Sequence, residues 1–356
     1  MTASATDFIP HSRPTLGEEE ARAAAAVVAS GQLAEGPETA AFERELGLQV
    51  GAPHAVAVSS GTAALYAVLA GMRIGAGHEV IIPSFVCAAL LHAVAATHAV
   101  PVPAEIDPVT LNLDPQDVGR RLSRRTAAVI LPHMFGLPAD LEGFLGLGVP
   151  VIEDCAQSLG AVYGGRPVGS FGRAAVFSFY ATKVIATGEG GMVATRSREL
   201  AARVNDLKTY DRRDEHATRF NFKLTDIQAA IGRVQLGRLN AFIGRRRAIA
   251  RSYRSAFQEL PVRLPPDAGG HIYFRYVLNV GADCTEFIRR AAAAGIGCAR
   301  PVYIPLHRLL KLDGFPRTER AWRQCVSIPI YPSLTDADVE RIISVVSGLL
   351  KSPAGI

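Results

Sequence analysis

Three polar motifs that are far apart in the sequence each come directly after a short apolar run. Gly61 and Thr62 lie where one such run gives way to a helical pattern. Asp154 follows a second run, and Lys183 follows a third. In an open α/β sheet, ligands bind beyond the carboxyl ends of the strands, which is where these motifs are expected. The chain could therefore bring together a glycine turn, a carboxylate and an amine at one site.

An amine, a carboxylate and a glycine turn are the three parts needed to hold pyridoxal 5′-phosphate (PLP). The amine of Lys183 would form a Schiff base with the cofactor and later carry protons as a general acid and base. The carboxylate of Asp154 would keep the pyridine nitrogen protonated, so that the ring acts as an electron sink. The N–H groups and dipole of a helix that starts at Gly61-Thr62 would favour the phosphate. The sequence thus predicts a PLP site with Lys183 and Asp154 as its catalytic residues.

Each of these motifs also has an ordinary structural explanation when it is taken alone. Gly61-Thr62 could form an N-cap turn, and Asp154 could cap the helix that follows it. A lysine such as Lys183 is most often a surface residue. The cofactor hypothesis therefore rests on the three motifs occurring together.

Neighbouring polar residues could complete such a site. Gln157 lies three residues beyond Asp154 and could reach the ring hydroxyl of the cofactor. Ser178 lies five residues before Lys183 and could donate a hydrogen bond to the phosphate. The glycine-rich run Thr187–Gly191 matches neither a Walker loop nor a GxGxxG motif, so a nucleotide-hydrolysis function is not predicted.

The composition indicates a soluble, globular chain. Of its 356 residues, 49% are apolar and 20% are charged, and the net charge of +5 could help to attract anionic substrates. The dense basic run Arg245–Arg247 lies in a helical pattern and is interpreted as a solvated helix face, so no nucleic-acid partner is predicted. The five cysteines are scattered and include no CxxC pair, so neither a metal site nor a disulfide framework is predicted.

Neither a secretion signal nor a membrane span is predicted. The N-terminal segment carries acidic residues and lacks a basic-then-apolar leader. No uninterrupted apolar run is long enough to cross a bilayer. We therefore expect a cytoplasmic protein without a membrane partner.

Short apolar runs alternate with helical stretches from His54 onward. This alternation implies crossover units, so we predict an α/β fold with a mostly parallel seven-stranded sheet flanked by helices. The pattern changes near Asn240, which predicts a large domain over residues 1–240, with an N-terminal arm, and a smaller α+β domain over residues 241–356. The predicted strands of the sheet are Ala55–Ser59, Glu79–Pro83, Val100–Ile106, Ala127–His133, Pro150–Asp154, Ala174–Phe179 and Gly191–Ala194.

The smaller domain has a different order of elements. We predict a long helix over Leu239–Leu260, a strand-like run over His271–Val280 and a helix over Thr285–Ala294. A proline-rich stretch from residue 300 to residue 332 follows. The last helix begins near Thr335, where the sequence resembles a capping box with Asp338 in place of glutamate.

Together these motifs resemble those of the DegT/StrS family of PLP-dependent sugar aminotransferases, which have the aspartate aminotransferase (fold type I) architecture. The resemblance covers nearly the whole chain, with its motifs in the same order. They are Ile9-Pro10, Gly31–Pro37, Ser60–Leu65, Glu153–Gln157, Ser178–Lys183, Thr187–Gly191, Phe220–Ala230 and Ile328–Ile330.

The resemblance implies transfer of an amino group from L-glutamate, or L-glutamine, to a keto group of a nucleotide-linked sugar or of a cyclitol of the scyllo-inosose type. It implies that Lys183 holds the cofactor as the internal aldimine. It also implies a homodimer with shared active sites, because Asn221 matches a family residue that reaches the phosphate bound by the neighbouring subunit. The other cofactor contacts that it implies are those of Asp154 with the pyridine nitrogen, Gln157 with the ring hydroxyl, and Gly61, Thr62 and Ser178 with the phosphate.

Two positions depart from the family pattern. The family usually places an aromatic residue after Pro83-Ser84, against the face of the cofactor ring. Cys87 stands at that position here and Phe85 lies two residues before it, so either of the two could cover the ring. Lys223 stands where the family more often has arginine.

The substrate side of the site is marked less clearly. Three residues lie in regions that often face the substrate in this family, and each could equally pack in the core or lie on the surface: His271, Tyr303 and His307. A dehydratase branch of the family has histidine at the lysine position, so Lys183 favours aminotransfer. The alternatives are a PLP-dependent lyase or desulfurase and a PLP-binding regulator. A desulfurase needs a mobile catalytic cysteine, and neither Cys298 nor Cys325 lies in a recognisable loop motif.

Overall fold

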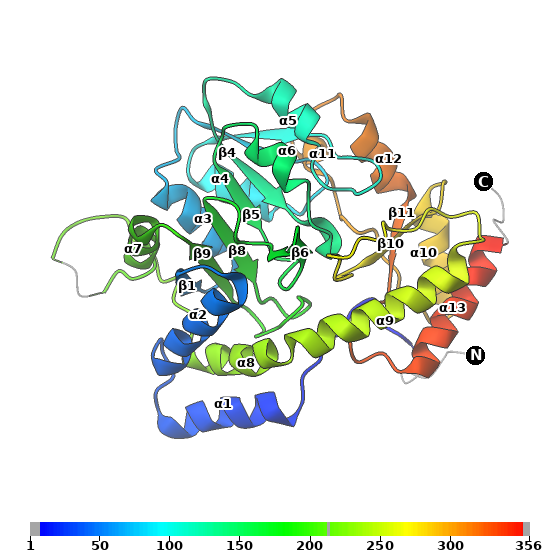
Figure 1. Ribbon diagram of the computed structural model, residues 1–356, viewed down its shortest axis with the longest axis horizontal. Coiled ribbons are helices and arrows are strands. Elements are labelled where there is room, and N and C mark those ends of the chain that lie inside the picture. The colour runs from blue at the N-terminus through cyan, green and yellow to red at the C-terminus, as the bar shows by residue number, and fades with distance from the viewer. Residues whose placement is uncertain (1–7, 212–213, 352–356) are drawn as a thin grey trace.

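The protein is built around one seven-stranded sheet (Figure 1). The computed structural model describes residues 8–211 and 214–351. In spatial order the strands are β1 (His54–Val58), β9 (Gly191–Thr195), β8 (Ala174–Ser178), β5 (Val151–Asp154), β4 (Thr126–Pro132), β2 (Glu79–Pro83) and β3 (Val100–Ala104). β9 is antiparallel to both of its neighbours, and the other neighbouring pairs are parallel. The predicted α/β fold with a mostly parallel sheet is confirmed.

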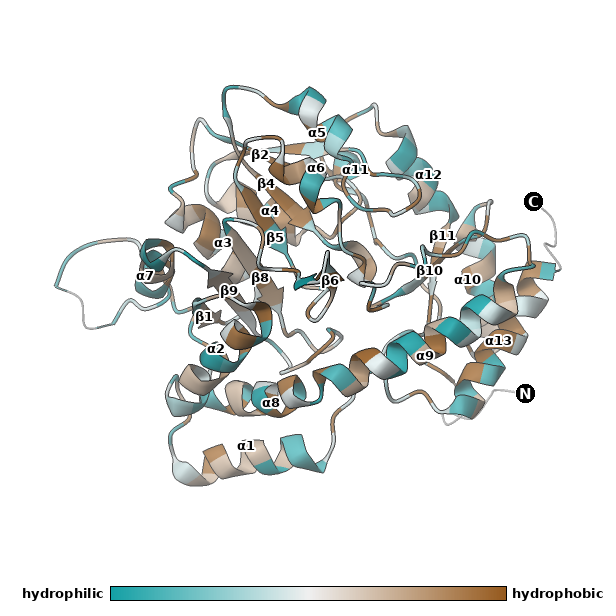
Figure 2. Ribbon diagram, in the orientation of Figure 1, coloured by the Kyte–Doolittle hydropathy of each residue, from teal (hydrophilic) through white to brown (hydrophobic). Residues whose placement is uncertain are grey.

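Helices cover both faces of this sheet, which explains why its strands are apolar on both sides. Val56 and Val58 of β1 belong to the core on one face, whereas Ala57 belongs to the core on the other. Figure 2 shows the central strands in the colours of apolar residues and the helices with mixed bands. The first face is covered by α3 (Gly61–Gly71), α4 (Ala89–Ala96) and α7 (Arg198–Leu207), and the second by α2 (Pro37–Val50), α5 (Pro115–Arg121), α6 (Leu141–Leu145) and α8 (Asp226–Gly237).

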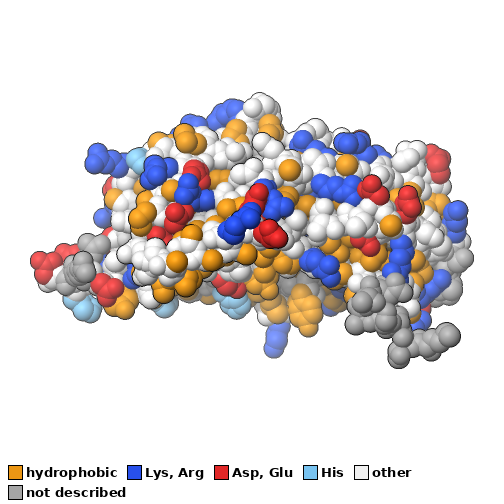
Figure 3. Space-filling view, turned by 90° about the horizontal axis from the view of Figure 1, so that it is seen from below, with side chains coloured by type: hydrophobic (Ala, Val, Ile, Leu, Met, Phe, Trp, Pro, Cys, Tyr) orange, Lys and Arg blue, Asp and Glu red, His pale blue; other side chains and the backbone are white. Residues whose placement is uncertain are grey.

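Helix α1 (Glu18–Ser30) lies outside this layer, against α8. Its buried Glu20 accepts hydrogen bonds from Nε2 of Gln235 at 2.6 Å and from Nη1 of Arg238 at 2.7 Å, which ties the two helices together. Figure 3 shows the molecule from this side, where hydrophobic and charged side chains are intermixed. Val28 of α1 is among the exposed hydrophobic residues.

The C-terminal third has a hydrophobic core of its own. It is formed by α9 (Leu239–Phe257), α10 (Cys284–Ala293), α13 (Asp336–Lys351) and the antiparallel pair β10 (Tyr276–Asn279) and β11 (Cys325–Ile328). The N-terminal segment joins this core, because Ile9 forms a parallel bridge with Ile296. We propose that the predicted smaller domain, residues 241–356, corresponds to this core. The separate core of its described residues, which end at Lys351, supports the proposal.

Several elements differ in extent from the predictions. The strand-like run at His271 is shorter, since only Tyr276–Asn279 pairs as a strand. The proline-rich stretch contains two unpredicted helices, α11 (Leu306–Leu309) and α12 (Pro316–Gln324). Pro316 occupies the first turn of α12, where a missing N–H costs nothing. The capping box is confirmed, because Thr335 N–H donates to Asp338 Oδ2 at 2.9 Å and Asp338 N–H donates to Thr335 Oγ1 at 3.1 Å.

The remaining elements of the described chain are short. They are the 3₁₀ turn η1 (Met134–Gly136) and the hairpin of β6 (Val162–Tyr163) and β7 (Arg166–Pro167). Among residues 8–211 and 214–351, no helix combines the length and apolar character that a bilayer span requires.

Candidate active site

The glycine turn holds the start of α3 against the end of strand β8. Ser60 is the N-cap of this helix, and its Oγ accepts a hydrogen bond from Ala63 N–H at 3.1 Å. A Cβ atom added to Gly61 would lie 2.8 Å from the Cβ of Ser178, so only glycine fits there without displacement. Thr62 is exposed beside it. The helix N-terminus, Thr62 and Ser178 thus form one small polar cradle.

Asp154 ends the central strand β5 and is buried. Its Oδ1 accepts a hydrogen bond from Ala156 N–H at 3.0 Å. Burial raises the pKa of the Asp154 carboxyl, although the Ala156 N–H and the charge of Lys183 partly oppose the shift. A carboxylate in this position is stabilised by a further positive partner, which a pyridinium nitrogen would supply.

Lys183 lies in the loop that follows β8. The loop is tied to its own chain, because Lys183 N–H donates to the Tyr180 carbonyl at 2.8 Å and Ala181 N–H donates to the Gly188 carbonyl at 2.9 Å. Burial lowers the pKa of the Lys183 amine; the charge of Arg275 adds to this shift, while Cys87 and Asp154 oppose it. A lowered pKa makes the neutral, nucleophilic amine more available at neutral pH.

The two candidates for covering the cofactor ring lie in different environments. Phe85 has 0% of its surface exposed and packs edge-on against Phe135, with ring centroids 6.4 Å apart. Cys87 is exposed and lies within the electrostatic reach of both Asp154 and Lys183. Loss of hydration by the thiol and the Asp154 charge raise the pKa of Cys87, and the Lys183 charge opposes them. Cys87 therefore borders Asp154 and Lys183, whereas the Phe85 ring is fully buried.

Gln157 is held in one orientation by the backbone. Its Oε1 accepts a hydrogen bond from Phe135 N–H at 2.8 Å. Phe135 has a φ of 60°, in the left-handed region that a non-glycine residue rarely adopts. Because the oxygen is engaged, the amide group of Gln157 presents its Nε2 donor to other groups.

Of the three predicted substrate residues, two are buried and hold contacts within the protein, and one is exposed. His307 is buried, with Nδ1 2.6 Å from Ser84 Oγ and Nε2 2.8 Å from Glu319 Oε1, so both ring nitrogens are occupied. His271 is also buried, with its two ring nitrogens facing the Pro266 and Phe135 carbonyls at 3.4 and 3.3 Å. Tyr303 is 87% exposed. Both ring nitrogens of His307 are therefore engaged. The neutral ring of His271 can donate to only one of its two carbonyl neighbours.

The sequence prediction missed Phe274 and Arg275. The amine of Lys183 lies 5.6 Å from the centroid of the Phe274 ring, and the guanidinium of Arg275 lies 4.8 Å from it. Burial lowers the pKa of Arg275 to about 10. The available signal was an arginine inside the otherwise apolar run His271–Val280. Charged residues are rarely found within apolar strands, so an arginine at this position indicates a candidate functional residue.

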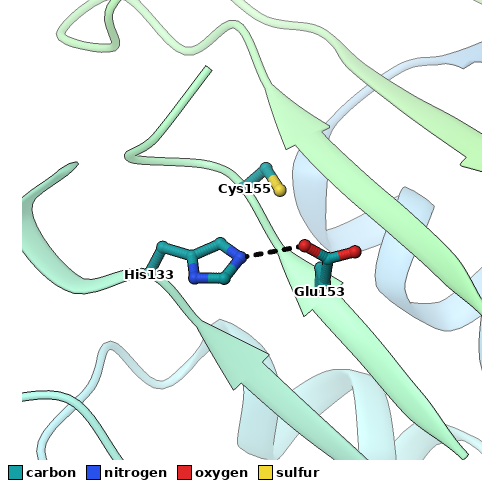
Figure 4. A group of neighbouring side chains, drawn as sticks. All are labelled: His133, Glu153 and Cys155. Carbon is teal, nitrogen blue, oxygen red and sulfur yellow. Dashed lines mark hydrogen bonds and ion pairs between the residues drawn. The ribbon is translucent and has the colours of Figure 1, made fainter. Parts of the chain in front are cut away.

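His133, Glu153 and Cys155 form a buried cluster next to Asp154 (Figure 4), and their ligand atoms lie within 4.8 Å of one another. Ala139 N–H donates to His133 Nδ1 at 3.0 Å, so Nε2 carries the proton and donates to Glu153 Oε2 at 3.1 Å. The other hydrogen bonds to Glu153 come from the N–H groups of Gly169, Phe171 and Gly172, each at 2.7 Å.

These bonds occupy both ring nitrogens of His133 and both carboxylate oxygens of Glu153, which are atoms that could otherwise bind a metal. Burial opposes ionisation of Glu153, but the hydrogen bonds from His133 and from the backbone N–H groups outweigh it and lower the pKa of the carboxyl. His133 N–H also donates to the Asp154 carbonyl at 3.2 Å. The cluster therefore locks the ends of β4 and β5 together and fixes the backbone that carries Asp154.

The sequence and the fold match known aminotransferases. A profile of the DegT/DnrJ/EryC1/StrS aminotransferase family matches residues 14–347. The chain belongs to this family. It is 35% identical to the spore coat polysaccharide biosynthesis protein SpsC of Bacillus subtilis strain 168, over 99% of each chain. The predicted family and the predicted enzyme class, a PLP-dependent aminotransferase, are confirmed.

Two solved aminotransferase structures show how closely the fold agrees. The aminotransferase TlmJ from Streptoalloteichus hindustanus is 33% identical, with a TM-score of 0.93 over 98% of this chain and 100% of its own. Spr1654 from Streptococcus pneumoniae, assigned as a sugar aminotransferase, is 25% identical, with a TM-score of 0.93 over 98% of this chain and 100% of its own in its PLP form. PLP is accordingly the cofactor of this family and of this enzyme.

The residues present fit this cofactor. The cradle at Gly61 is closed from behind, because a Cβ atom on Gly191 would lie 2.3 Å from the Ser60 carbonyl oxygen, and it opens at the N-terminus of α3. A helix N-terminus with glycine and hydroxyl residues suits a phosphate. The buried carboxylate of Asp154 and the amine of Lys183 supply the other two contacts that PLP requires.

Asn221 lies in a segment beside the end of β1, where Ser59 N–H donates to the Phe222 carbonyl at 2.7 Å. The rings of Phe220 and Phe222 stack with centroids 4.8 Å apart, whereas Asn221 is exposed. Lys223 Nζ lies 3.5 Å from Asp211 Oδ2. The side chain of Asn221 is therefore open to solvent in this chain.

Proposed function

We propose that this aminotransferase moves the amino group of L-glutamate to a keto group of a nucleotide-linked sugar. The observation that carries the proposal is that the half-buried Lys183, in the loop after β8, interacts electrostatically with Asp154 at the end of β5, next to a phosphate cradle. The acceptor class is supported by the relatives, since SpsC serves polysaccharide biosynthesis and Spr1654 is assigned as a sugar aminotransferase. A cyclitol ketone is the alternative acceptor, and L-glutamine is the alternative donor.

Lys183 has two roles in this proposal. It attaches the cofactor, and after the amino donor has taken its place its amine carries a proton between two carbon atoms. Burial suits both roles, because it lowers the pKa of the amine and so favours the neutral base. Bound PLP would supply the electron sink for negative charge that develops at the reacting carbon.

The remaining cofactor contacts are assigned from the surroundings of each side chain. Asp154 would keep the pyridine nitrogen protonated. Gln157 would donate its Nε2 to the ring hydroxyl, because its Oε1 is already engaged. Cys87, rather than the fully buried Phe85, would contact the ring face. The phosphate contacts in this proposal are those of Gly61, Thr62 and Ser178.

The active unit in this proposal is a homodimer with shared sites. The exposed side chain of Asn221 would reach the phosphate bound by the other subunit. The cytoplasm is the proposed location, and it is supported by five cysteines that all remain unpaired.

The donor is tested first, with PLP-loaded protein and no acceptor. L-glutamate should shift the absorbance of the bound cofactor and release 2-oxoglutarate in a one-to-one ratio with active sites. L-glutamine, tested in parallel, separates the two donor candidates. A cofactor whose spectrum is unchanged by either amino acid would refute both donor assignments.

The acceptor is tested by mass spectrometry of products from a panel of nucleotide-linked keto sugars and scyllo-inosose. Amination of a nucleotide-linked sugar supports the proposal, and its position on the ring can be read from the product. Amination of the cyclitol alone would reject the proposed acceptor and leave the donor unaffected.

A further inference from the structure

Ser84 begins the turn that joins β2 to α4 (residues 84–88), and all of its polar groups are bonded within the protein. The residue is fully buried. Its N–H donates to the Ala104 carbonyl, and its carbonyl accepts from Leu306 N–H, both at 2.8 Å. Its Oγ lies 2.6 Å from Nδ1 of His307 and accepts a hydrogen bond from His307 N–H at 3.2 Å. The start of this turn is therefore held by β3 on one side and by α11 on the other.

The second ring nitrogen of His307 is held by α12. Its Nε2 lies 2.8 Å from Oε1 of Glu319, and its ring stacks on Phe315 with centroids 4.8 Å apart. Arg308 donates to both oxygens of Glu319. The hydrogen bonds from Arg308 and His307 lower the pKa of Glu319 to about 2, so this carboxylate only accepts at neutral pH. Nε2 therefore carries a proton, and the neutral form of the ring accepts the Ser84 O–H at Nδ1.

The turn that begins at Ser84 leads to two residues assigned to the cofactor ring. The next residue, Phe85, packs edge-on against Phe135, with ring centroids 6.4 Å apart. Phe135 N–H in turn donates to Oε1 of Gln157 at 2.8 Å. Cys87, three residues beyond Ser84, is exposed and interacts electrostatically with the lysine and the aspartate of the site. A shift of Ser84 would therefore move the groups that face the ring.

We propose that His307 is a positioning residue for the cofactor ring. Held by Glu319, it fixes Ser84 and thereby the turn that presents Cys87 to the face of the ring. Imidazole suits this role, because one rigid ring bonds in two directions at once. Both nitrogens are engaged within the protein, so His307 acts through the turn and not by contact with substrate. The contact of Cys87 with the ring rests on the proposed function, whereas the bonds from Glu319 to Ser84 belong to the structure itself.

The test uses PLP-loaded protein and two readouts. The circular dichroism band of the bound cofactor reports the orientation of its ring, and mass spectrometry follows alkylation of Cys87 by iodoacetamide. His307→Leu removes both side-chain bonds, so it should weaken the band and speed alkylation about 3- to 10-fold, the scale of one lost hydrogen bond. His307→Asn can place an amide oxygen near the position of Nδ1 and should return both readouts toward the wild type. If His307→Leu does not fold, Glu319→Ala replaces it, with a smaller change in the same direction.

Thr318→Val is the matched control. It breaks another buried hydrogen bond of α12, the one from Thr318 Oγ1 to Glu105 at 2.6 Å, and leaves the bonds of His307 in place. This variant should lose thermal stability and keep both readouts at their wild-type values. Equal changes in Thr318→Val and His307→Leu would reduce His307 to a structural residue. Wild-type readouts in His307→Leu, or no recovery in His307→Asn, would overturn the proposal as well.

Neither readout depends on turnover, so a failure of the assigned donor or acceptor leaves the test intact. The ring contact of Cys87 is checked by removing PLP from the wild-type protein, which should speed alkylation. An unchanged rate would mean that Cys87 does not cover the ring, and that part of the proposed function would fail. A cofactor band that still depends on His307 would then keep the positioning role.

Discussion

Gly61 and Ser178 lie so close together that any side chain on Gly61 would meet Ser178. The Cβ–Cβ separation would be 2.8 Å, well inside van der Waals contact, and neither atom lies at the flexible end of a side chain. These residues come from the start of α3 and the end of β8, which are 117 positions apart in the sequence. Their contact places the helix N-terminus at the edge of the sheet from which Lys183 follows.

We therefore predict that Gly61→Ala weakens PLP binding and destabilises the fold by about 1–3 kcal/mol, the usual cost of overpacking. PLP titration and thermal unfolding measure the two effects. Gly244→Ala in α9 is the control, because its Cβ would have no neighbour within 4 Å. Alanine is the better helix former by about 1 kcal/mol, so Gly244→Ala should stabilise the protein. Equal PLP affinity of Gly61→Ala and the wild type would contradict the role of the cradle.

Lys183 should be the residue that carries the cofactor. Borohydride reduction of the loaded enzyme should fix PLP on the peptide that contains Lys183, as read by mass spectrometry. Lys183→Ala should abolish turnover, because it removes both the attachment point and the proton carrier. Label on another lysine would reject the assignment. Lys208 is the control lysine in the same digest. It is fully buried, but its amine is paired with Glu35 at 2.7 Å, so its peptide should carry no label.

Asp154→Asn should retain the fold and lose activity. The amide keeps the shape of the side chain but cannot hold a proton on the pyridine nitrogen by charge. We expect turnover to fall by about 10²-fold or more, the scale for loss of one charged stabilising interaction. Steady-state rates at saturating PLP measure this effect, and circular dichroism checks the fold. A variant that turns over at the wild-type rate would show that Asp154 has only a structural role.

Stability should fall on mild acidification because of buried histidine. Burial lowers the pKa of His271 from 6.5 to about 4, so the unfolded chain binds a proton below pH 6.5 that the folded chain refuses until pH 4. The contribution of His271 is thus fully present above pH 6.5 and is lost progressively toward pH 4. Between pH 7 and pH 5 this loss is about 2 kcal/mol.

Denaturant unfolding at several pH values measures this slope for the wild type and for His271→Gln. The variant should show a shallower slope. Some slope should remain, because burial lowers the pKa of His11 to about 3 in the same sense. Parallel slopes in the two proteins would exclude His271 as a source of the acid sensitivity.

The shared dimer site can be tested by complementation. Lys183→Ala and Asn221→Asp chains are mixed under conditions that exchange subunits. In a shared-site dimer, one site of a mixed dimer carries both lesions and the other carries neither, so activity should return. A persistent lack of activity, despite verified exchange and two inactive parents, would mean that Asn221 acts within its own chain. An active monomer at low concentration would exclude the dimer model.

The sequence predicted where the candidate site residues stand relative to the strands and helices. Gly61 and Lys183 follow strands and Asp154 ends one, and the end of a strand can be read from a few consecutive residues. The surroundings of His307 could not be read in this way, because its partner Ser84 is 223 positions away. The short helices α11 and α12 were hidden by prolines that mark turns in isolation but can also begin helices. Such outcomes are decided by tertiary contacts.

Helix α9 has a mechanical consequence. Its first turns, with Leu239 and Phe242, pack in the core beneath the sheet, and its last turns, with Tyr253 and Phe257, pack in the C-terminal core. Arg246, midway between them, is bonded to the carbonyls of Phe274 and Ile330. One unbroken helix therefore connects both cores rigidly and is hydrogen-bonded to Phe274, which lies beside Lys183. Rotation of the C-terminal core relative to the sheet would require α9 to bend. We therefore expect large substrates to enter through local movements of side chains and loops.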